Sequence, residues 1–165
     1  MTYLWTACSF CYYMIMFQMK YLPGNIYVNT YANQFSEIFA NVFTGVIYTR
    51  FGLKRSFTIS YGISVVGSVL IIMFGSALKV LMPLFVILAK FGIATAFTLC
   101  YIGNVDVFPT LFSVTAMGIC NFFARISTIL APEVAEVEAP VPMIIFCALS
   151  SLAIVVTQFV RPLKD

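Results

Sequence analysis

Three ionisable side chains lie inside long apolar stretches of this sequence: Glu37, Lys90 and Arg125. Charged groups in a membrane are costly, so they usually face the interior of a helix bundle, paired or next to water. Counted at about 1.5 Å per residue, Glu37 and Lys90 lie at similar depth, with Arg125 roughly one or two turns further out. We therefore predict a Glu37–Lys90 ion pair that leaves Arg125 free for a ligand. A structural network of all three charges is the alternative.

A polar face accompanies the first of these charges. Asn33, Glu37 and Asn41 follow one another at i, i+4 and i+8, so in a helix they share one face. Such a face cannot look at lipid, and we expect it to look at other helices or at a water-filled cavity. Asn41 is therefore counted with the charged residues as a candidate ligand contact.

Aromatic residues add a second kind of ligand chemistry. Trp5, Tyr12, Tyr13 and Phe97 could surround an ammonium group through cation–π attraction. Arg125 carries a planar fork that suits a carboxylate, and a zwitterion would satisfy both. For each aromatic residue taken singly, ordinary helix packing is the alternative. The candidate substrate-binding residues are Trp5, Tyr12, Tyr13, Glu37, Asn41, Lys90, Phe97 and Arg125.

Six apolar blocks must position these residues. A helix of roughly 20 residues crosses a hydrocarbon core of about 30 Å. The chain is 62% hydrophobic and 9% charged, against about 45–50% and 25% in soluble domains. The blocks are too long and too uniformly apolar for barrel strands, so membrane helices are predicted. The predicted spans of this all-α membrane protein cover residues 2–19, 26–49, 57–78, 80–103, 111–131 and 141–160.

Basic residues predict the orientation of these spans. Lys and Arg are enriched in cytoplasmic loops, which puts the loop between the second and third spans, and both termini, in the cytoplasm. The first block has no basic leader and no cleavage site, so we interpret it as an uncleaved span. The residues on the cytoplasmic side are Arg50, Lys54, Arg55, Arg161 and Lys164, against Lys20 and Lys79 on the other.

Two further patterns favour packing over chemistry. Ser60, Ser64 and Ser68 recur every four residues, which predicts a seam where helices approach closely. The cysteines fall within predicted helices and the chain has no His, so buried thiols are favoured over a metal or redox site. No acid–base pair stands out, and no catalytic residue, cofactor, metal or nucleic-acid partner is predicted. The cysteines are Cys8, Cys11, Cys100, Cys120 and Cys147.

Three stretches together resemble the major facilitator superfamily and, within it, the organic cation, organic anion and carnitine transporters. Residues 49–55 (TRFGLKR) are similar to the family's D-R-x-G-R-R loop. Residues 90–93 (KFGI) with 106–110 (DVFPT) are similar to its G-K-F…E-L-[YF]-P-T run, and residues 124–132 (ARISTILAP) to its A-R-x-G-x-I-x-[SA]-P. The resemblance identifies residues 1–165 as the C-terminal six-helix bundle, helices seven to twelve, of a twelve-helix carrier.

The resemblance implies transport of a small organic cation, anion or carnitine-like zwitterion by alternating access, in the plasma membrane. One bundle cannot seal a cavity at both ends, so a half-transporter or truncated form needs an N-terminal half or a second copy. Thr49 replaces the acid of the loop motif and Ser113 replaces an Arg. These departures favour the alternative, a non-transporting structural or regulatory membrane subunit, whereas the retained charges of Glu37, Lys90 and Arg125 favour the transporter. The implied gating-loop residues are Arg50, Gly52, Lys54, Arg55, Asp106 and Pro109.

Overall fold

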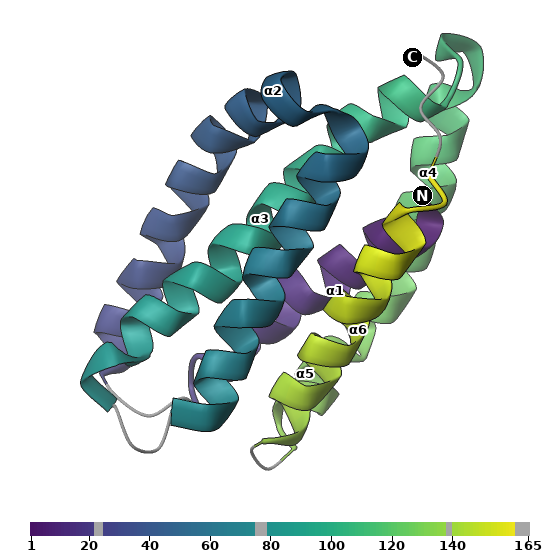
Figure 1. The fold of residues 1–165 in the computed structure, drawn as a ribbon. Coiled ribbons are helices and arrows are strands. Elements are labelled where there is room, and N and C mark those ends of the chain that lie inside the picture. Colours follow the sequence, from purple (N-terminus) through teal and green to yellow (C-terminus); the bar gives the residue numbers. More distant parts are fainter. Residues whose placement is uncertain (22–24, 75–78, 138–139, 161–165) are drawn as a thin grey trace.

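A computed structural model describes residues 1–21, 25–74, 79–137 and 140–160, and every regular element within these ranges is a helix. In these ranges the chain runs up and down through one bundle, with α2 folding back on itself and the short α5 following directly on α4 (Figure 1). Part of the predicted third span, together with Arg161 and Lys164, lies outside the described residues. The elements are α1 (Thr2–Gln18), α2 (Ile26–Phe74), the 3-10 turn η1 (Lys79–Leu81), α3 (Met82–Val107), α4 (Thr110–Ile129), α5 (Ala131–Ala135) and α6 (Val141–Thr157).

Helix α2 contains the second and third predicted spans. Gly52 has φ 73° and ψ 173°, a backbone conformation that is essentially restricted to glycine. At this residue the helix folds back, and residues 26–51 and 53–74 form two arms that run in opposite directions from the bend and both contact α3 (Figure 1). We expected a loop over residues 50–56, and that expectation was wrong because one glycine makes the whole reversal.

Prolines determine where the later helices begin and end. The sequence predicted that the fourth span ends at residue 103, but α3 continues to Val107. Phe108 is extended because the residue before a proline avoids the helical region, and Pro109 then starts α4. The predicted fifth span corresponds to α4 and ends at the first residue of the short α5, which carries Pro132 in its first turn.

Length and composition make α2, α3 and α4 long and apolar enough to cross a membrane. Helix α6 is apolar as well but has 17 residues. Large apolar side chains are exposed on several of these helices, among them Phe39, Val66 and Phe122. An apolar exterior of this kind is what a helix presents to lipid.

The second arm of α2 packs closely against α3. Ser60, Ser64 and Ser68 are all buried, and the Ser64 hydroxyl donates to the Ala89 carbonyl at 3.2 Å. A Cβ added at Gly67 would lie 2.4 Å from the Ala89 nitrogen. A Cβ added at Gly92 would lie 2.5 Å from the Ser60 carbonyl oxygen. The predicted packing seam is therefore confirmed, since only residues without side-chain bulk permit this approach.

Polar contacts tie the bend of α2 to the ends of its neighbours. The Tyr48 hydroxyl donates to the Asp106 carboxylate near the end of α3. The Lys54 ammonium donates to the Gln158 carbonyl at the end of α6, at 3.0 Å. The bend, the end of α3 and the end of α6 thus lie at one end of the bundle, and α5 lies at the other (Figure 1).

Candidate functional site

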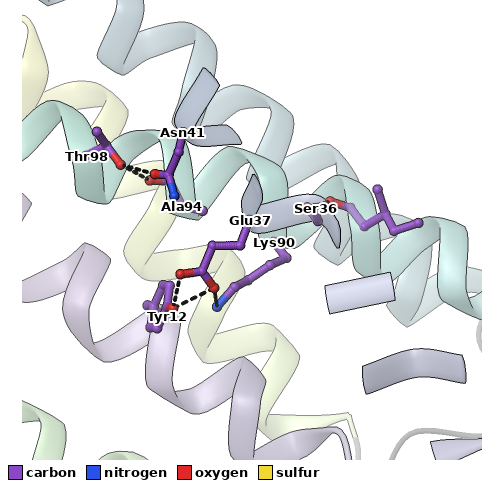
Figure 2. A network of polar contacts seen from close by, with 8 residues as sticks. Tyr12, Ser36, Glu37, Asn41, Lys90, Ala94 and Thr98 are labelled. Atoms are coloured by element: carbon purple, nitrogen blue, oxygen red, sulfur yellow. Dashed lines mark hydrogen bonds and ion pairs between the residues drawn. The ribbon is translucent and has the colours of Figure 1, made fainter. Parts of the chain in front are cut away.

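Tyr12, Glu37 and Lys90 meet where α1, the first arm of α2 and α3 come together (Figure 2). The Tyr12 hydroxyl lies 2.7 Å from both oxygens of the Glu37 carboxylate. The Lys90 Nζ lies 3.9 Å from Glu37 Oε2. One carboxylate therefore links three helices that are far apart in the sequence.

The ion pair predicted from helix depth is present, and it is asymmetric in its exposure. The Lys90 side chain is 0% exposed, whereas that of Glu37 is 32% exposed. A buried ammonium needs a partner because leaving water is costly for a charge. Glu37 compensates that charge, and about a third of its side chain is still exposed.

The Tyr12 ring contacts a cation that the protein itself supplies. Lys90 Nζ lies 3.1 Å from the centre of this ring, within the range of cation–π attraction. Phe97 stacks on the same ring, with centroids 5.3 Å apart and planes 28° apart. The Tyr12 ring is therefore already in contact with Lys90 and Phe97, and its hydroxyl is bonded to Glu37.

The predicted aromatic residues form a row rather than a closed box. Tyr13 lies edge-on to Tyr12 at 5.4 Å, and Phe97 lies edge-on to Tyr101 at 5.5 Å. Trp5 joins the row through Tyr101 at 4.7 Å, and it is 0% exposed within the core. The sequence reasoning missed Tyr101, although it follows Phe97 by four residues and therefore shares its helix face.

A pocket of about 410 Å³ lies beside Glu37. Among the described lining residues, Glu37 is the only one of a type that is charged at neutral pH in water, and Asn41 lies next to it on the same arm. The Asn41 amide oxygen accepts a hydrogen bond from the Thr98 hydroxyl at 2.9 Å, which ties the pocket wall to α3 (Figure 2). Gln34 and Met16 were not among the predicted contacts. The lining residues are Tyr12, Met16, Gln34, Glu37, Ile38 and Asn41.

Arg125 lies apart from this pocket. It is exposed on α4, and its Nη1 lies 3.4 Å from the Tyr13 hydroxyl. Arg125 therefore reaches the aromatic row through Tyr13, which is the one hydrogen-bond partner of its guanidinium within the described ranges. Of the eight predicted contacts, only Tyr12, Glu37 and Asn41 line the Glu37 pocket among the described residues. The other five are Trp5, Tyr13, Lys90, Phe97 and Arg125.

The residues implied as a gating loop lie at the bend of α2 and at the α3–α4 junction. Arg50 and Arg55 are exposed, and Lys54 donates to α6 as described above. Asp106 accepts from Tyr48 and forms no ion pair with these cations among the residues that the structure describes. Pro109 is exposed at the start of α4.

The two departures from the loop motifs each make local contacts. The Thr49 hydroxyl donates back to the Val46 carbonyl at 3.1 Å. Ser113 is buried, and its hydroxyl and carbonyl oxygens both accept from the Asn104 side-chain amide at 2.8 Å. A neutral hydrogen bond between α3 and α4 thus stands at the position where the resemblance has an arginine.

Comparison with known proteins identifies several relatives. The chain is 30% identical over 155 residues to the human protein "Solute carrier family 22 member 13", which covers 90% of this chain. It is 29% identical over 161 residues to the mouse protein "Organic cation/carnitine transporter 2" and 27% identical to mouse "Solute carrier family 22 member 21". In each case the chain spans 28% of the relative's length. No family model matches the chain.

Proposed function

We propose that this chain, a relative of the organic cation and carnitine transporters of solute carrier family 22, moves small organic ions across a membrane as part of a larger carrier. Its apolar helices and its relatives make it a membrane protein related to transporters. We propose further that the chain forms the six-helix half of a major facilitator fold. In this proposal, its substrates are small organic ions and the transport mechanism is alternating access.

The observation that carries the proposal is the group of contacts among Tyr12, Glu37 and Lys90 beside a pocket. Lys90 is compensated inside the protein, so the exposed edge of Glu37 is the charge that the pocket offers to a ligand. A carboxylate at the edge of a pocket favours a ligand with a cationic group, which it attracts by charge whether or not that group carries an N–H. This polar group inside an apolar bundle is typical of a substrate pathway.

Arg125 supplies the complementary end of the proposed site. Its guanidinium fork suits a carboxylate, and Tyr13 holds it next to the aromatic row. A zwitterion such as carnitine would place its cationic group toward Glu37 and its carboxylate toward Arg125. The single chain offers these groups from one side, so closing the site requires further helices, either an N-terminal half or a second copy.

Ligand binding by the purified chain tests this proposal without requiring transport. We expect carnitine to raise the unfolding temperature of the chain more than urate or tetraethylammonium does, and Glu37→Gln to remove at least most of that shift. Glu136→Gln, an exposed acid beyond α5, is the matched control and should retain it. Each shift is measured against the variant's own ligand-free temperature. No shift for any of the three ligands, or an equal loss in both variants, would refute the proposed site.

A charge reversal tests the second part of the site. Arg125→Asp should weaken carnitine and urate binding and spare tetraethylammonium, because only the first two carry an anionic group. An unchanged ligand preference would refute the role of Arg125 while leaving that of Glu37 intact.

A further inference from the structure

We propose that a second pocket, at the bend of α2, binds the headgroup of an anionic phospholipid through Arg55 and Lys54. The pocket measures about 480 Å³ and lies between the second arm of α2 and the end of α6. This inference does not rest on the transport proposal. The lining residues are Lys54, Arg55, Thr58, Ile59 and Gln158.

A ring of hydrogen bonds builds one wall of this pocket. The Lys54 ammonium donates to the Gln158 carbonyl at 3.0 Å, and the Gln158 amide donates to the Thr58 hydroxyl at 3.3 Å. The Thr58 hydroxyl donates to the Lys54 carbonyl at 3.1 Å. This ring holds Lys54 in place while two of its three ammonium protons are left for another acceptor.

The charge of the pocket is not balanced by the protein that the structure describes. Arg55 is exposed, and its guanidinium makes no hydrogen bond or ion pair within the described ranges. The described acids are Glu37, Asp106, Glu133 and Glu136, and none of them lines the pocket. Lys54 and Arg55 therefore offer several donors to an anion, and a phosphate oxygen suits both side chains.

The surface next to the pocket favours a lipid as the source of that phosphate. Ile59, Gly62 and Val66 follow Arg55 at i+4, i+7 and i+11, so all four share one face of the arm. Ile59 and Val66 are 36% and 53% exposed, and a Cβ at Gly62 would meet nothing within 4 Å. A basic group at the end of an apolar, partly open helix face matches a headgroup above its acyl chain.

Native mass spectrometry of the full chain in detergent micelles tests the proposal. Phosphatidylserine and phosphatidylglycerol are compared with phosphatidylcholine carrying the same acyl chains. We expect the anionic lipids to bind about fivefold more strongly than phosphatidylcholine, because one basic residue near a membrane surface contributes an attraction of about that size. In the Arg55→Gln variant, the anionic lipids should bind about as strongly as phosphatidylcholine does. The Arg55→Lys variant should keep most of the preference for anionic lipids.

Two controls make the outcome decisive. Lys20→Gln removes an exposed cation beyond the end of α1 and should leave the preference unchanged. Glycerophosphoserine carries the headgroup without acyl chains and should not displace the bound lipid at equal concentration. Full displacement of the lipid would show a site for soluble phosphate compounds. A preference for anionic lipids that survives Arg55→Gln would show nonspecific attraction, and so would a preference that Lys20→Gln lowers as much as Arg55→Gln does. Each of these results would overturn the proposal.

Discussion

The ammonium of Lys90 and the carboxylate of Glu37 have different environments, and this difference has a measurable consequence. Lys90 is fully buried and depends on Glu37 and the Tyr12 ring, whereas Glu37 is one-third exposed. Removing one partner of a buried pair costs most when the remaining charge cannot reach water. We therefore expect Glu37→Gln to destabilise the chain by about 2 kcal/mol and Lys90→Met by less than about 1 kcal/mol.

Thermal unfolding of both variants in one detergent checks this order. Tyr12→Phe is a useful companion because it keeps the ring over Lys90 and removes the hydroxyl that reaches Glu37. It should fall between the other two variants. Equal losses for Glu37→Gln and Lys90→Met would mean that the two charges share one environment, contrary to the structure.

For single residues, the sequence predicted the depth of a side chain in the bundle better than it predicted which other side chains it contacts. The Glu37–Lys90 pair could be predicted because helical rise converts residue number into depth. The place of Tyr12 between them could not, because it depends on how α1 crosses α3. The same limit applies to Trp5, which was predicted as a ligand contact and lies buried against Tyr101.

The packing of α2 against α3 depends on two glycines that lack room for a side chain. A Cβ at Gly67 or at Gly92 would meet backbone atoms of the opposite helix within 2.5 Å, so the helices would have to separate. Overpacking of this kind usually costs about 1–3 kcal/mol. We expect Gly67→Ala and Gly92→Ala each to lower the unfolding temperature clearly.

Gly62→Ala provides the matched control, because it lies in the same arm as Gly67 and its Cβ would meet nothing within 4 Å. Alanine favours helix over glycine by about 1 kcal/mol in soluble hosts, so this variant should be neutral or slightly more stable. A loss as large as that of Gly67→Ala would show that glycine flexibility, rather than close packing, matters in this arm.

The helical elements were largely predictable, because the sequence consists of long apolar blocks that prolines punctuate. Among the described residues, however, only α2, α3 and α4 are long and apolar enough to cross a membrane. The residues at which the helices begin and end were less predictable. Pro109 ends α3 from two residues away, which allowed the helix to continue beyond the predicted boundary to Val107. Gly52 reverses the chain within one residue, where the sequence alone indicated a loop. Neither the packing of both arms of α2 against α3 nor the crossing of α1 follows from periodicity.

The whole molecule has two distinct ends, and basic residues at the bend of α2 predict that this end is cytoplasmic. Arg50 is exposed at the bend, and Val137 is exposed just beyond α5 at the opposite end (Figure 1). On intact cells, a membrane-impermeant thiol reagent should label Val137→Cys at once and Arg50→Cys only after permeabilisation.

The unmodified chain provides the background for this labelling. Four of its five cysteines are buried, and Cys147 is partly exposed within α6. Labelling of Arg50→Cys on intact cells, with Val137→Cys protected, would reverse the predicted orientation. Equal labelling of both before permeabilisation would contradict the placement of the two ends on opposite sides of the membrane.

The pocket beside Glu37 belongs to a chain that spans 28% of the length of the relatives named above. Alternating access needs a second set of helices that closes over the site from the other side. If the proposal is right, proteoliposomes that contain only this chain should bind labelled carnitine, with Glu37→Gln reducing the binding, and should accumulate no more of it than empty vesicles. Time-dependent uptake that a Glu37→Gln variant abolishes would show instead that copies of this chain complete the carrier among themselves, since a single bundle has no means of closing both ends of its cavity.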